Sequence, residues 1–415
     1  MTACGHVTAR PVAGKADLRR WITLPRTGVH APSSPWVPPL DGDLERLLDR
    51  RRNPFFAYGD AVPYLAVDEH DQPVGRVLAH VYHRHNVRHG ERAAFFGLFE
   101  CRDDREAARV LIDAARAYGA RQGCTTLRGP FNMTAMQEMG ILTDGFAAPP
   151  AVDETYTAPY YPALLEGAGL RPVFPVSTFR VDVARAEPDA MLSDRHRALT
   201  ASGRLRIRPA DLGHFEREVE TLRELLNDSF YENPHFVPIT HDEFVFQIGP
   251  YRRLLDPAIS LVAELDGVPC GFTITVPDYN PILKRMDGRL GPREALIFLS
   301  QRPRIRGAVL IIMGVQTQLQ GQGVMRVLQA ELVRALRRRG YRRLTVTWVA
   351  DDNEKSLATV AALGGRPLHR LTLYEGEIPF QPAIVMAPRR PDPEGSWQGR
   401  TLKGHRGSLT RAHAG

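Results

Sequence analysis

The alternation of apolar and polar positions repeats in the two halves of the chain. An apolar run, a polar turn and a Pro-x-Gly step into a second apolar run occur at residues 65–81 (LAVDEHDQPVGRVLAHV) and at residues 261–276 (LVAELDGVPCGFTITV). Each pattern predicts a β-hairpin. The hairpins are offset by 196 residues, and LLEGAGLRPV and VAALGGRPLH align Arg171 with Arg366 at an offset of 195. A duplicated unit explains both offsets.

Each half also carries an amphipathic helix followed by a strand. REAARVLIDAARAYGARQG precedes TTLRG, and MRVLQAELVRALRRRG precedes RLTVTWV. In the second helix every fourth residue is apolar and forms one face: Val324, Leu328, Leu332 and Leu336. Each unit is therefore expected to run strand, strand, strand, helix, strand, helix, strand. The predicted fold class is mixed α/β, with a mostly antiparallel sheet that contains one parallel βαβ step.

Length and composition set the boundaries of the two units. A chain of 415 residues is long enough for two domains of ordinary size. The expected division is one domain at residues 41–185, a linker helix within residues 186–205 and a second domain at residues 206–388. Residues 1–40 and 389–415 are rich in Pro, Gly, Arg and Ser and lack periodicity. Both are expected to be disordered tails.

The formal charge of +7 is concentrated in these tails, which carry +4 each and leave the body near −1. A basic nucleic-acid-binding surface is therefore not expected. The chain has no apolar run of signal-peptide or membrane-spanning character, and its four cysteines show no Cys-x-x-Cys spacing. The prediction is a cytoplasmic protein with reduced thiols, no metal site and no membrane partner.

A glycine turn, QLQGQGVM at residues 318–325, lies between the apolar run AVLIIMGV and the second amphipathic helix. Such a turn exposes backbone N–H groups at the positive end of the helix dipole, which attracts phosphate. Glycine allows the phosphate to approach the backbone closely. The alternative interpretation is a tight connection between a strand and a helix.

The wider segment GVQTQLQGQGVMRVL resembles motif A of the GNAT acyltransferases, in which a strand leads into R/Q-x-x-G-x-G/A. The matching residues are Gln320, Gly321, Gln322, Gly323 and Val324, with Met325 where the family usually has Gly or Ala. The next segment, RLTVTWVADDNEKSLATVAALGGRPLHRLTLYE, resembles the motif B region. At FFGLFE, RGPFN and PYYPALLEGAGL the chain also resembles uncharacterised bacterial proteins with two tandem GNAT-like modules.

The resemblance implies that the second module binds acetyl-coenzyme A or another acyl-coenzyme A. Backbone N–H groups of residues 321–325 would contact the pyrophosphate, at the end of the strand that closes with Gly314 and Val315. The Val315 amide would stabilise the oxyanion formed at the thioester. Asn353 and Ser356 would hydrogen-bond the pantetheine arm, although Asn353 is equally suited to cap a helix.

The catalytic groups implied by the resemblance are incomplete. Many family members have a Tyr acid where this chain has Val360, so Ser356, Tyr374 or water is the candidate acid. The candidate bases are Asp278 and Glu232. The candidate acceptor-binding residues are Asn132, Tyr231, Asn233, Tyr279 and Asn280.

The first module has Asp103 and Asp104 where the second has its glycines. Carboxylates at a helix N-terminus satisfy the dipole and repel phosphate, so this degenerate module is not expected to bind coenzyme A.

The expected protein is therefore an acyltransferase with two tandem GNAT-like modules. It would move an acyl group, acetyl first among the candidates, from coenzyme A to a small-molecule amine by direct attack. Two alternatives remain open: an aminoacyl-tRNA-dependent transferase and a non-catalytic acyl-coenzyme A-binding protein.

Overall fold

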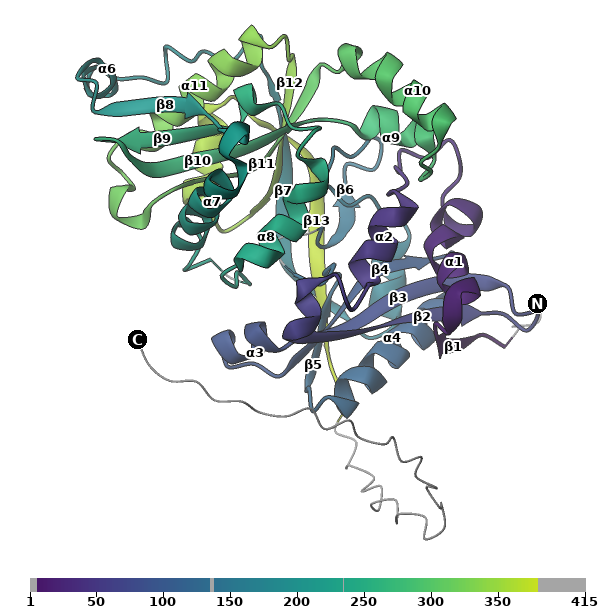
Figure 1. The fold of residues 1–415 in the computed structure, drawn as a ribbon. Coiled ribbons are helices and arrows are strands. Elements are labelled where there is room, and N and C mark those ends of the chain that lie inside the picture. The colour runs from purple at the N-terminus through teal and green to yellow at the C-terminus, as the bar shows by residue number, and fades with distance from the viewer. Residues whose placement is uncertain (1–5, 135–137, 234, 380–415) are drawn as a thin grey trace, which may run out of the picture. The chain divides into compact units, whose positions relative to one another are not determined.

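One mixed sheet of 13 strands runs through the part of the chain that the structure describes (Figure 1). The structure is a computed structural model that describes residues 6–134, 138–233 and 235–379. The strands are β1 (Thr8–Pro11), β2 (Gly59–Val67), β3 (Pro73–Tyr82), β4 (Ala93–Cys101), β5 (Thr126–Gly129), β6 (Ile141–Asp144), β7 (Arg171–Asp182), β8 (Leu205–Pro209), β9 (Leu261–Leu265), β10 (Val268–Pro277), β11 (Gly307–Val315), β12 (Arg343–Ala350) and β13 (Arg366–Glu377). Their order is β1-β2-β3-β4-β5-β13-β7-β12-β11-β10-β9-β8, and β6 pairs with β13.

Helices cover this sheet and connect its strands. They are α1 (Gly14–Leu24), α2 (Asp41–Leu48), α3 (His83–His89), α4 (Arg105–Arg121), α5 (Tyr161–Gly167), α6 (Asp194–Ala201), α7 (Phe215–Ser229), α8 (His241–Ile248), α9 (Asn280–Met286), α10 (Pro292–Gln301), α11 (Val324–Arg338) and α12 (Glu354–Ala362). The long helix α4 packs on β2, β3 and β4, and α11 packs on β9, β10 and β11. Their apolar faces supply the two main cores.

The predicted repeat and fold class are confirmed. The pairs β4–β5 and β11–β12 are parallel, whereas the other strand pairs of the sheet are antiparallel. We call the part built on β1–β6 and α1–α5 the first module, and the part built on β8–β12 and α7–α12 the second module. Helices α4 and α11 both end at a glycine in the left-handed conformation, Gly123 and Gly340, as helix C-termini often do.

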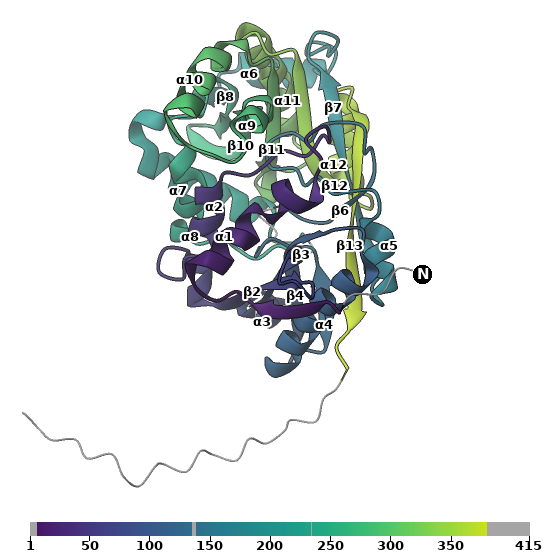
Figure 2. The ribbon, with the colours of Figure 1, turned by 90° about the vertical axis from the view of Figure 1, so that its right-hand side faces the viewer.

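The last strand of each half pairs with the other half. Strand β7 pairs with β12 of the second module, and β13 pairs with β5 and β6 of the first. The two exchanged strands also pair with each other, antiparallel, and lie side by side in Figures 1 and 2. Sequence halves and spatial halves therefore differ at this point, which the repeat in the sequence could not reveal.

The exchange carries side chains into the partner core. From β7, Phe179 and Val181 join the core beneath α11, followed by Val183 directly after the strand. From β13, Tyr374 joins the core beneath α4. Each core is therefore completed by the other half of the chain, and neither half buries its apolar surface alone.

The expectation of a disordered tail over residues 1–40 is wrong for the residues that the structure describes, which begin at His6. Strand β1 pairs with β2, and α1 buries Trp21, whose indole N–H donates to the Tyr64 carbonyl at 3.1 Å. The prediction failed because it relied on the average composition of this segment. A few large apolar residues in it, among them Trp21, Ile22 and Leu24, pack on one face of the sheet. The predicted tail at residues 389–415 lies outside the described residues.

The strand exchange predicts that residues 206–379 do not fold when expressed alone, because β12 then has a free edge and the second core lacks Phe179, Val181 and Val183. Circular dichroism and size-exclusion chromatography would show an unfolded or aggregated fragment. Co-expression with residues 1–205 should restore a stable complex.

The matched control is the full chain cut at the exposed turn around Gly203, between α6 and β8. The cut chain should keep its fold, because both exchanged strands stay paired. A monomeric fragment 206–379 with cooperative unfolding would contradict the role given to the exchange.

Candidate functional site

A gap opens between β11 and β12 in the second module. The two strands pair in parallel from Gly307–Arg343 to Leu310–Val346, and within the described residues this pairing ends there. Strand β11 continues to Val315, and β12 continues to Ala350 with its other edge paired to β7. At the start of the gap the Thr347 hydroxyl donates to the Ile311 carbonyl at 2.7 Å. The gap is therefore bordered by the backbone of β11 on one side.

The amides of Met313 and Val315 point into this gap. On the β10 side, the Gln316 N–H donates to the Cys270 carbonyl at 2.9 Å. Because successive residues of a strand direct their N–H groups to opposite sides, Val315 and Met313 direct theirs away from β10. Gly314 lies between them, and a Cβ there would come within 2.8 Å of Phe272 and Ser229, so glycine lets α7 approach β11.

The glycine turn ends at an open helix N-terminus. Gly321 and Gly323 have φ values of +74° and +94°, which favour glycine, and α11 begins at Val324 without a side-chain cap. A Cβ on Gly321 would meet nothing within 4 Å. The neighbouring side chains turn back on the loop: Gln320 Nε2 donates to Val315 O, and Gln322 Nε2 donates to Gln318 O. Met325 packs against the second core.

A histidine of the linker helix lies over this turn. A Cβ on Gly323 would lie 2.5 Å from the ring of His196 in α6. The His196 Nδ1 faces the Ser193 backbone N–H at 3.0 Å and accepts from it, so its Nε2 carries the proton. Burial, Arg195 and Arg326 lower the pKa of His196. The potential anion site at the glycine turn is therefore bordered by His196 of the linker helix, with Arg195 and Arg326 nearby.

The matching place in the first module is filled by the protein itself. Asp104 caps α4 by accepting from the backbone N–H of Glu106 and Ala107, at 2.9 and 3.1 Å. In the gap beyond β4 the Phe131 N–H donates to Phe96 O, and Asn132 Oδ1 accepts from the Leu98 N–H. These contacts agree with the expectation that this module does not hold a phosphate at α4.

The motif B residues of the second module have mainly structural contacts. Asn353 Oδ1 accepts from the Ser356 N–H at 3.0 Å, so Asn353 caps α12. Ser356 is half-buried in the first turn of that helix. Val360 is only 3% exposed and belongs to the second core, which explains why an apolar residue stands there.

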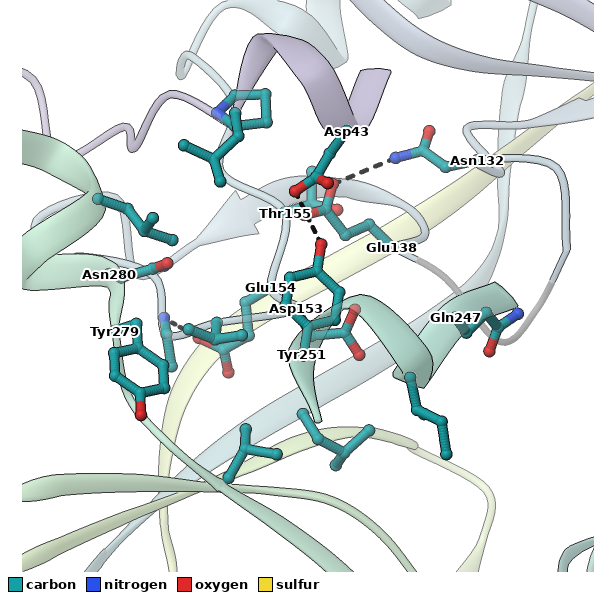
Figure 3. Close-up of a pocket in the computed structure, with 18 of the residues that line it drawn as sticks. Asp43, Asn132, Glu138, Asp153, Glu154, Thr155, Gln247, Tyr251, Tyr279 and Asn280 are labelled. Atoms are coloured by element: carbon teal, nitrogen blue, oxygen red, sulfur yellow. Dashed lines mark hydrogen bonds between the residues drawn. The ribbon is translucent and has the colours of Figure 1, made fainter. Parts of the chain in front are cut away.

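A cavity of about 500 Å³ lies between the two modules (Figure 3). Most of its wall is apolar, with residues 36–40, α2 and the first-module loops on one side and α7, α8, α9 and α10 on the other. Ile311 and Ile312, where the gap between β11 and β12 begins, also line it. The cavity has the size of a small-molecule site and reaches the place where β11 and β12 separate.

Several carboxylates of the first module border this apolar cavity, among them Glu138, Asp153 and Glu154. Burial, together with Glu100, raises the pKa of Glu138 to about 7, and its Oε2 accepts from Asn132 at 3.2 Å. The Asp153 side chain is exposed to the cavity, and the protein that encloses it, with Glu138 and Glu154 nearby, raises the pKa of Asp153 to about 8. Asp153 also has a positive φ of 65°, which is uncommon for residues other than glycine.

Two buried polar atoms on the same loop lack a hydrogen-bond partner among the described residues. They are Glu154 Oε1 and Thr155 Oγ1, and both residues line the cavity. The other Glu154 oxygen accepts from the Ala151 N–H at 2.7 Å. Buried polar atoms are normally satisfied, so these two atoms are available to a polar group of a ligand.

The candidate acceptor residues fall into two groups. Asn132, Tyr279 and Asn280 line the cavity, where Asn280 Nδ2 donates to Pro150 O at 2.9 Å. The loop that contains Tyr231, Glu232 and Asn233 does not line it. Instead, the Arg88 guanidinium of α3 lies 4.0 Å from the Tyr231 ring centroid, so this loop ties the modules together.

Glu232 is exposed and lies outside the cavity. The expected catalytic roles of Asp278 and Tyr374 also disagree with their positions in the structure. Asp278 follows β10, which runs antiparallel to β11, so it lies beside Gly307 at the opposite end of β11 from Val315. Its Oδ1 accepts from the Val152 and Asn280 N–H groups. The exchange of β13 places Tyr374 in the first core, where its hydroxyl donates to Glu166 at 3.3 Å. Neither residue is positioned to act at the β11–β12 gap.

Sequence reasoning did not single out the carboxylates of the cavity. Glu138 lies close in sequence to Asn132, a candidate acceptor-binding residue, but Asp153 and Glu154 belong to a loop without a recognisable pattern, PPAVDET. Their role depends on the apolar wall opposite them, which comes from distant parts of the chain. No local pattern marks such a site.

No group of three or more His, Cys, Asp or Glu side chains in the described part of the chain could hold a metal ion. Nor is any helix there both long and apolar enough to cross a membrane.

Comparison with known proteins agrees with this geometry. Residues 219–364 match the acetyltransferase (GNAT) family. The chain is 28% identical to Protein YghO of Escherichia coli (strain K12) over 378 residues, which cover 89% of this chain and 95% of that protein. It is 26% identical to the bacterial ceramide synthase of Caulobacter vibrioides (strain NA1000 / CB15N) over 372 residues, 88% and 96% of the two chains.

Two solved structures share the fold. A tandem GNAT protein from the clavulanic acid biosynthesis pathway has a TM-score of 0.53 at 16% identity, and the match covers 90% of this chain and 99% of that one. A GCN5-related glucosamine N-acetyltransferase region of a fungal multi-domain β-N-acetylglucosaminidase has a TM-score of 0.51 at 14% identity, covering 90% and 38%. Residues 219–364 thus belong to the acetyltransferase (GNAT) family, and the chain is a GNAT-type acyltransferase with the fold of tandem GNAT proteins.

Proposed function

We propose that the protein transfers an acyl group from acyl-coenzyme A to the primary amine of a long-chain, mostly apolar acceptor bound in the cavity between the modules. The observation that carries this proposal is the cavity itself, which combines an apolar wall, buried carboxylates and contact with Ile311 and Ile312 at the β11–β12 gap. An apolar chain gains free energy on entering such a cavity, at about 25 cal/mol per Å² of buried surface. A cationic headgroup would be held by the carboxylates.

The acyl donor would bind along the gap and the glycine turn. The pantetheine arm would lie between β11 and β12, where the Met313 and Val315 amides are available. The pyrophosphate would meet the open N-terminus of α11 at Gly321 and Gly323. His196 Nε2, which faces the same turn, would donate to a phosphate oxygen.

The Caulobacter relative supports the acceptor class. That protein is named a ceramide synthase, and a ceramide is the N-acyl amide of a long-chain amino alcohol. An amino alcohol also suits the polar atoms of this cavity, since its hydroxyl groups can donate to Glu154 Oε1 and Thr155 Oγ1.

The transfer would proceed by direct attack. A carboxylate takes one proton from the acceptor ammonium, and the neutral nitrogen attacks the thioester carbonyl carbon. The Met313 and Val315 amides stabilise the oxyanion that forms. When the C–S bond breaks, the thiolate leaves and takes the remaining excess proton of the nitrogen, directly or through water. The products are an amide and free coenzyme A.

Asp153 would be the base in this reaction. It faces the cavity without a hydrogen bond to another described side chain, whereas Glu138 is held by Asn132. Enclosure in the cavity, with Glu138 and Glu154 nearby, brings the pKa of Asp153 to about 8, close to the pH at which a base is most effective in neutral solution. Asp153 lines the acceptor cavity, whereas Asp278 and Glu232 do not, and it therefore replaces them as the candidate base.

The two alternatives from the sequence are less favoured. An aminoacyl-tRNA-dependent transferase does not need the open glycine turn of α11. A protein that only binds acyl-coenzyme A does not need carboxylates with raised pKa values in an apolar cavity. Turnover of the thioester separates the second alternative from an enzyme.

The acceptor class is tested by supplying acyl-coenzyme A of several chain lengths together with a long-chain amino alcohol or with ethanolamine. Mass spectrometry should detect the amide of the long-chain amine, and ethanolamine should react far more slowly because it lacks the long alkyl chain, whose buried methylene groups are each worth about 0.8 kcal/mol. Faster acylation of ethanolamine would contradict the proposed acceptor.

The donor site is tested by Gly321→Asp. A carboxylate a few ångströms from the pyrophosphate should weaken coenzyme A binding roughly 100-fold, because like charges about 4 Å apart repel by several kcal/mol near a protein surface. The matched control is Gly340→Asp, since Gly340 also has a positive φ and no neighbour within 4 Å. Calorimetry should show normal binding for the control. Equal affinities in the two variants would exclude the glycine turn as the phosphate site.

The base is tested by the pH dependence of kcat. An ionised Asp153 is required, so kcat should rise between about pH 6 and about pH 9, with its midpoint near the raised pKa of about 8. Asp153→Asn should lower kcat by about 10²-fold or more and remove this rise. Glu138→Gln should shift the midpoint to lower pH, since it removes a neighbouring negative charge. An unchanged profile in Asp153→Asn would assign the base elsewhere.

A further inference from the structure

The segment between β10 and β11 forms a basic surface on a body of nearly neutral charge. Residues 285–306 contain six arginines, all exposed: Arg285, Arg289, Arg293, Arg302, Arg304 and Arg306. The same segment contains two acidic residues, Asp287 and Glu294, so its net charge is +4. We call residues 285–306 the basic insertion, because the first module has only the shorter α3 segment at this place.

Three leucines stand among these arginines. Leu290, Leu296 and Leu299 are 71%, 69% and 67% exposed. Leu296 and Leu299 are one turn apart on α10, which lies at the periphery of the molecule in Figures 1 and 2. The helix is attached through other residues, since Phe298 stacks on Tyr279 at 5.5 Å and Ile297 packs beside it. The leucines therefore contribute nothing to the core of the fold.

The arginines of the insertion are poorly neutralised within the described residues. Asp287 lies 3.8 Å from Arg289, and Arg302 and Arg306 donate to backbone carbonyls. No ion pair of Arg285, Arg293 or Arg304 occurs in that part of the chain. Exposed cations around exposed leucines match the two components of an anionic lipid surface, a charged headgroup layer above an apolar interior.

We propose that the basic insertion docks on an anionic phospholipid bilayer. Leu290, Leu296 and Leu299 enter the boundary between headgroups and acyl chains, and the arginines contact lipid phosphates. A spanning segment is not required for such binding, and the absence of one was the basis of the sequence-based expectation of no membrane partner.

Charge argues against other occupants of this surface. A second copy of the same surface would bring +4 against +4, and residues 389–415 carry a net charge of +4 as well. Nucleic acid would match the arginines, but three exposed leucines gain nothing from contact with phosphates. An anionic bilayer satisfies the arginines and the leucines together.

The insertion also contributes to the cavity wall. Its Phe298 lines the cavity, as does Leu283 just before the insertion, while Leu296 and Leu299 are exposed on the surface. A long-chain amine is itself a membrane lipid, so docking would bring its source next to the protein. The docking proposal does not depend on the proposed reaction, because it concerns a surface outside the cavity.

The test is flotation of the full-length protein with phosphatidylcholine vesicles, with and without phosphatidylglycerol. Binding is expected only to the anionic vesicles and should weaken as salt is added. Replacing Arg293 and Arg304 by Ser should lower the affinity by about fivefold for each arginine. Leu296→Ser combined with Leu299→Ser should lower it by about tenfold or more, because two inserted apolar side chains are lost.

The matched control is Val87→Ser, since Val87 is 84% exposed on α3 of the first module, outside the insertion. This variant should bind vesicles normally, and the leucine variant should still acylate a detergent-dispersed amine. Equal vesicle binding by the leucine variant, or binding to tRNA or polyglutamate in place of vesicles, would overturn the proposal. If the unmodified protein binds anionic vesicles but does not acylate the amine, that result would count against the proposed reaction and not against the docking surface.

Discussion

The pairing of β7 with β13 is the constraint on which the rest of the structure depends. These two strands close the opposite modules and pair with each other, so the two sheets become one. The inter-module wall is therefore part of the hydrogen-bonded framework and not a contact between two independent bodies. The cavity, with α7 and α8 on one side and first-module loops on the other, exists because this framework holds both sides in place.

The duplicated halves have diverged at corresponding positions. Helix α4 begins at Asp104, which satisfies its own N-terminus, whereas α11 begins at Gly323 with that terminus open. The first module fills its own strand gap with Phe131 and Asn132. That loop continues to Glu138, at the cavity. The first module, which has no open helix N-terminus for a phosphate at α4, thus supplies acidic groups to the shared cavity, and the two halves have different chemical roles.

The sequence predicted those features that depend on local spacing. Apolar periodicity located α4 and α11, and the glycines marked the turn before α11, whose left-handed backbone the structure reveals. Features that depend on distant contacts were not predictable in this way. The order of β7 and β13 in the sheet misled the interpretation of Tyr374, and the antiparallel direction of β10 misled that of Asp278. Asp153 gains its high pKa from the cavity that distant segments build around it and from Glu138 and Glu154 nearby.

The continuous sheet has a consequence for selectivity. Two modules joined by a flexible linker could swing apart to admit ligands of any length, but strands that cross between the modules leave no hinge there. The end wall of the cavity then limits the length of the chain that can bind. A chain that stops short leaves empty volume, and one that is too long must distort a close-packed wall. Each methylene is worth roughly 1–3 kcal/mol in such a pocket. In this fold, a change in preferred chain length would come from substitutions at the far wall and not from movement of the modules.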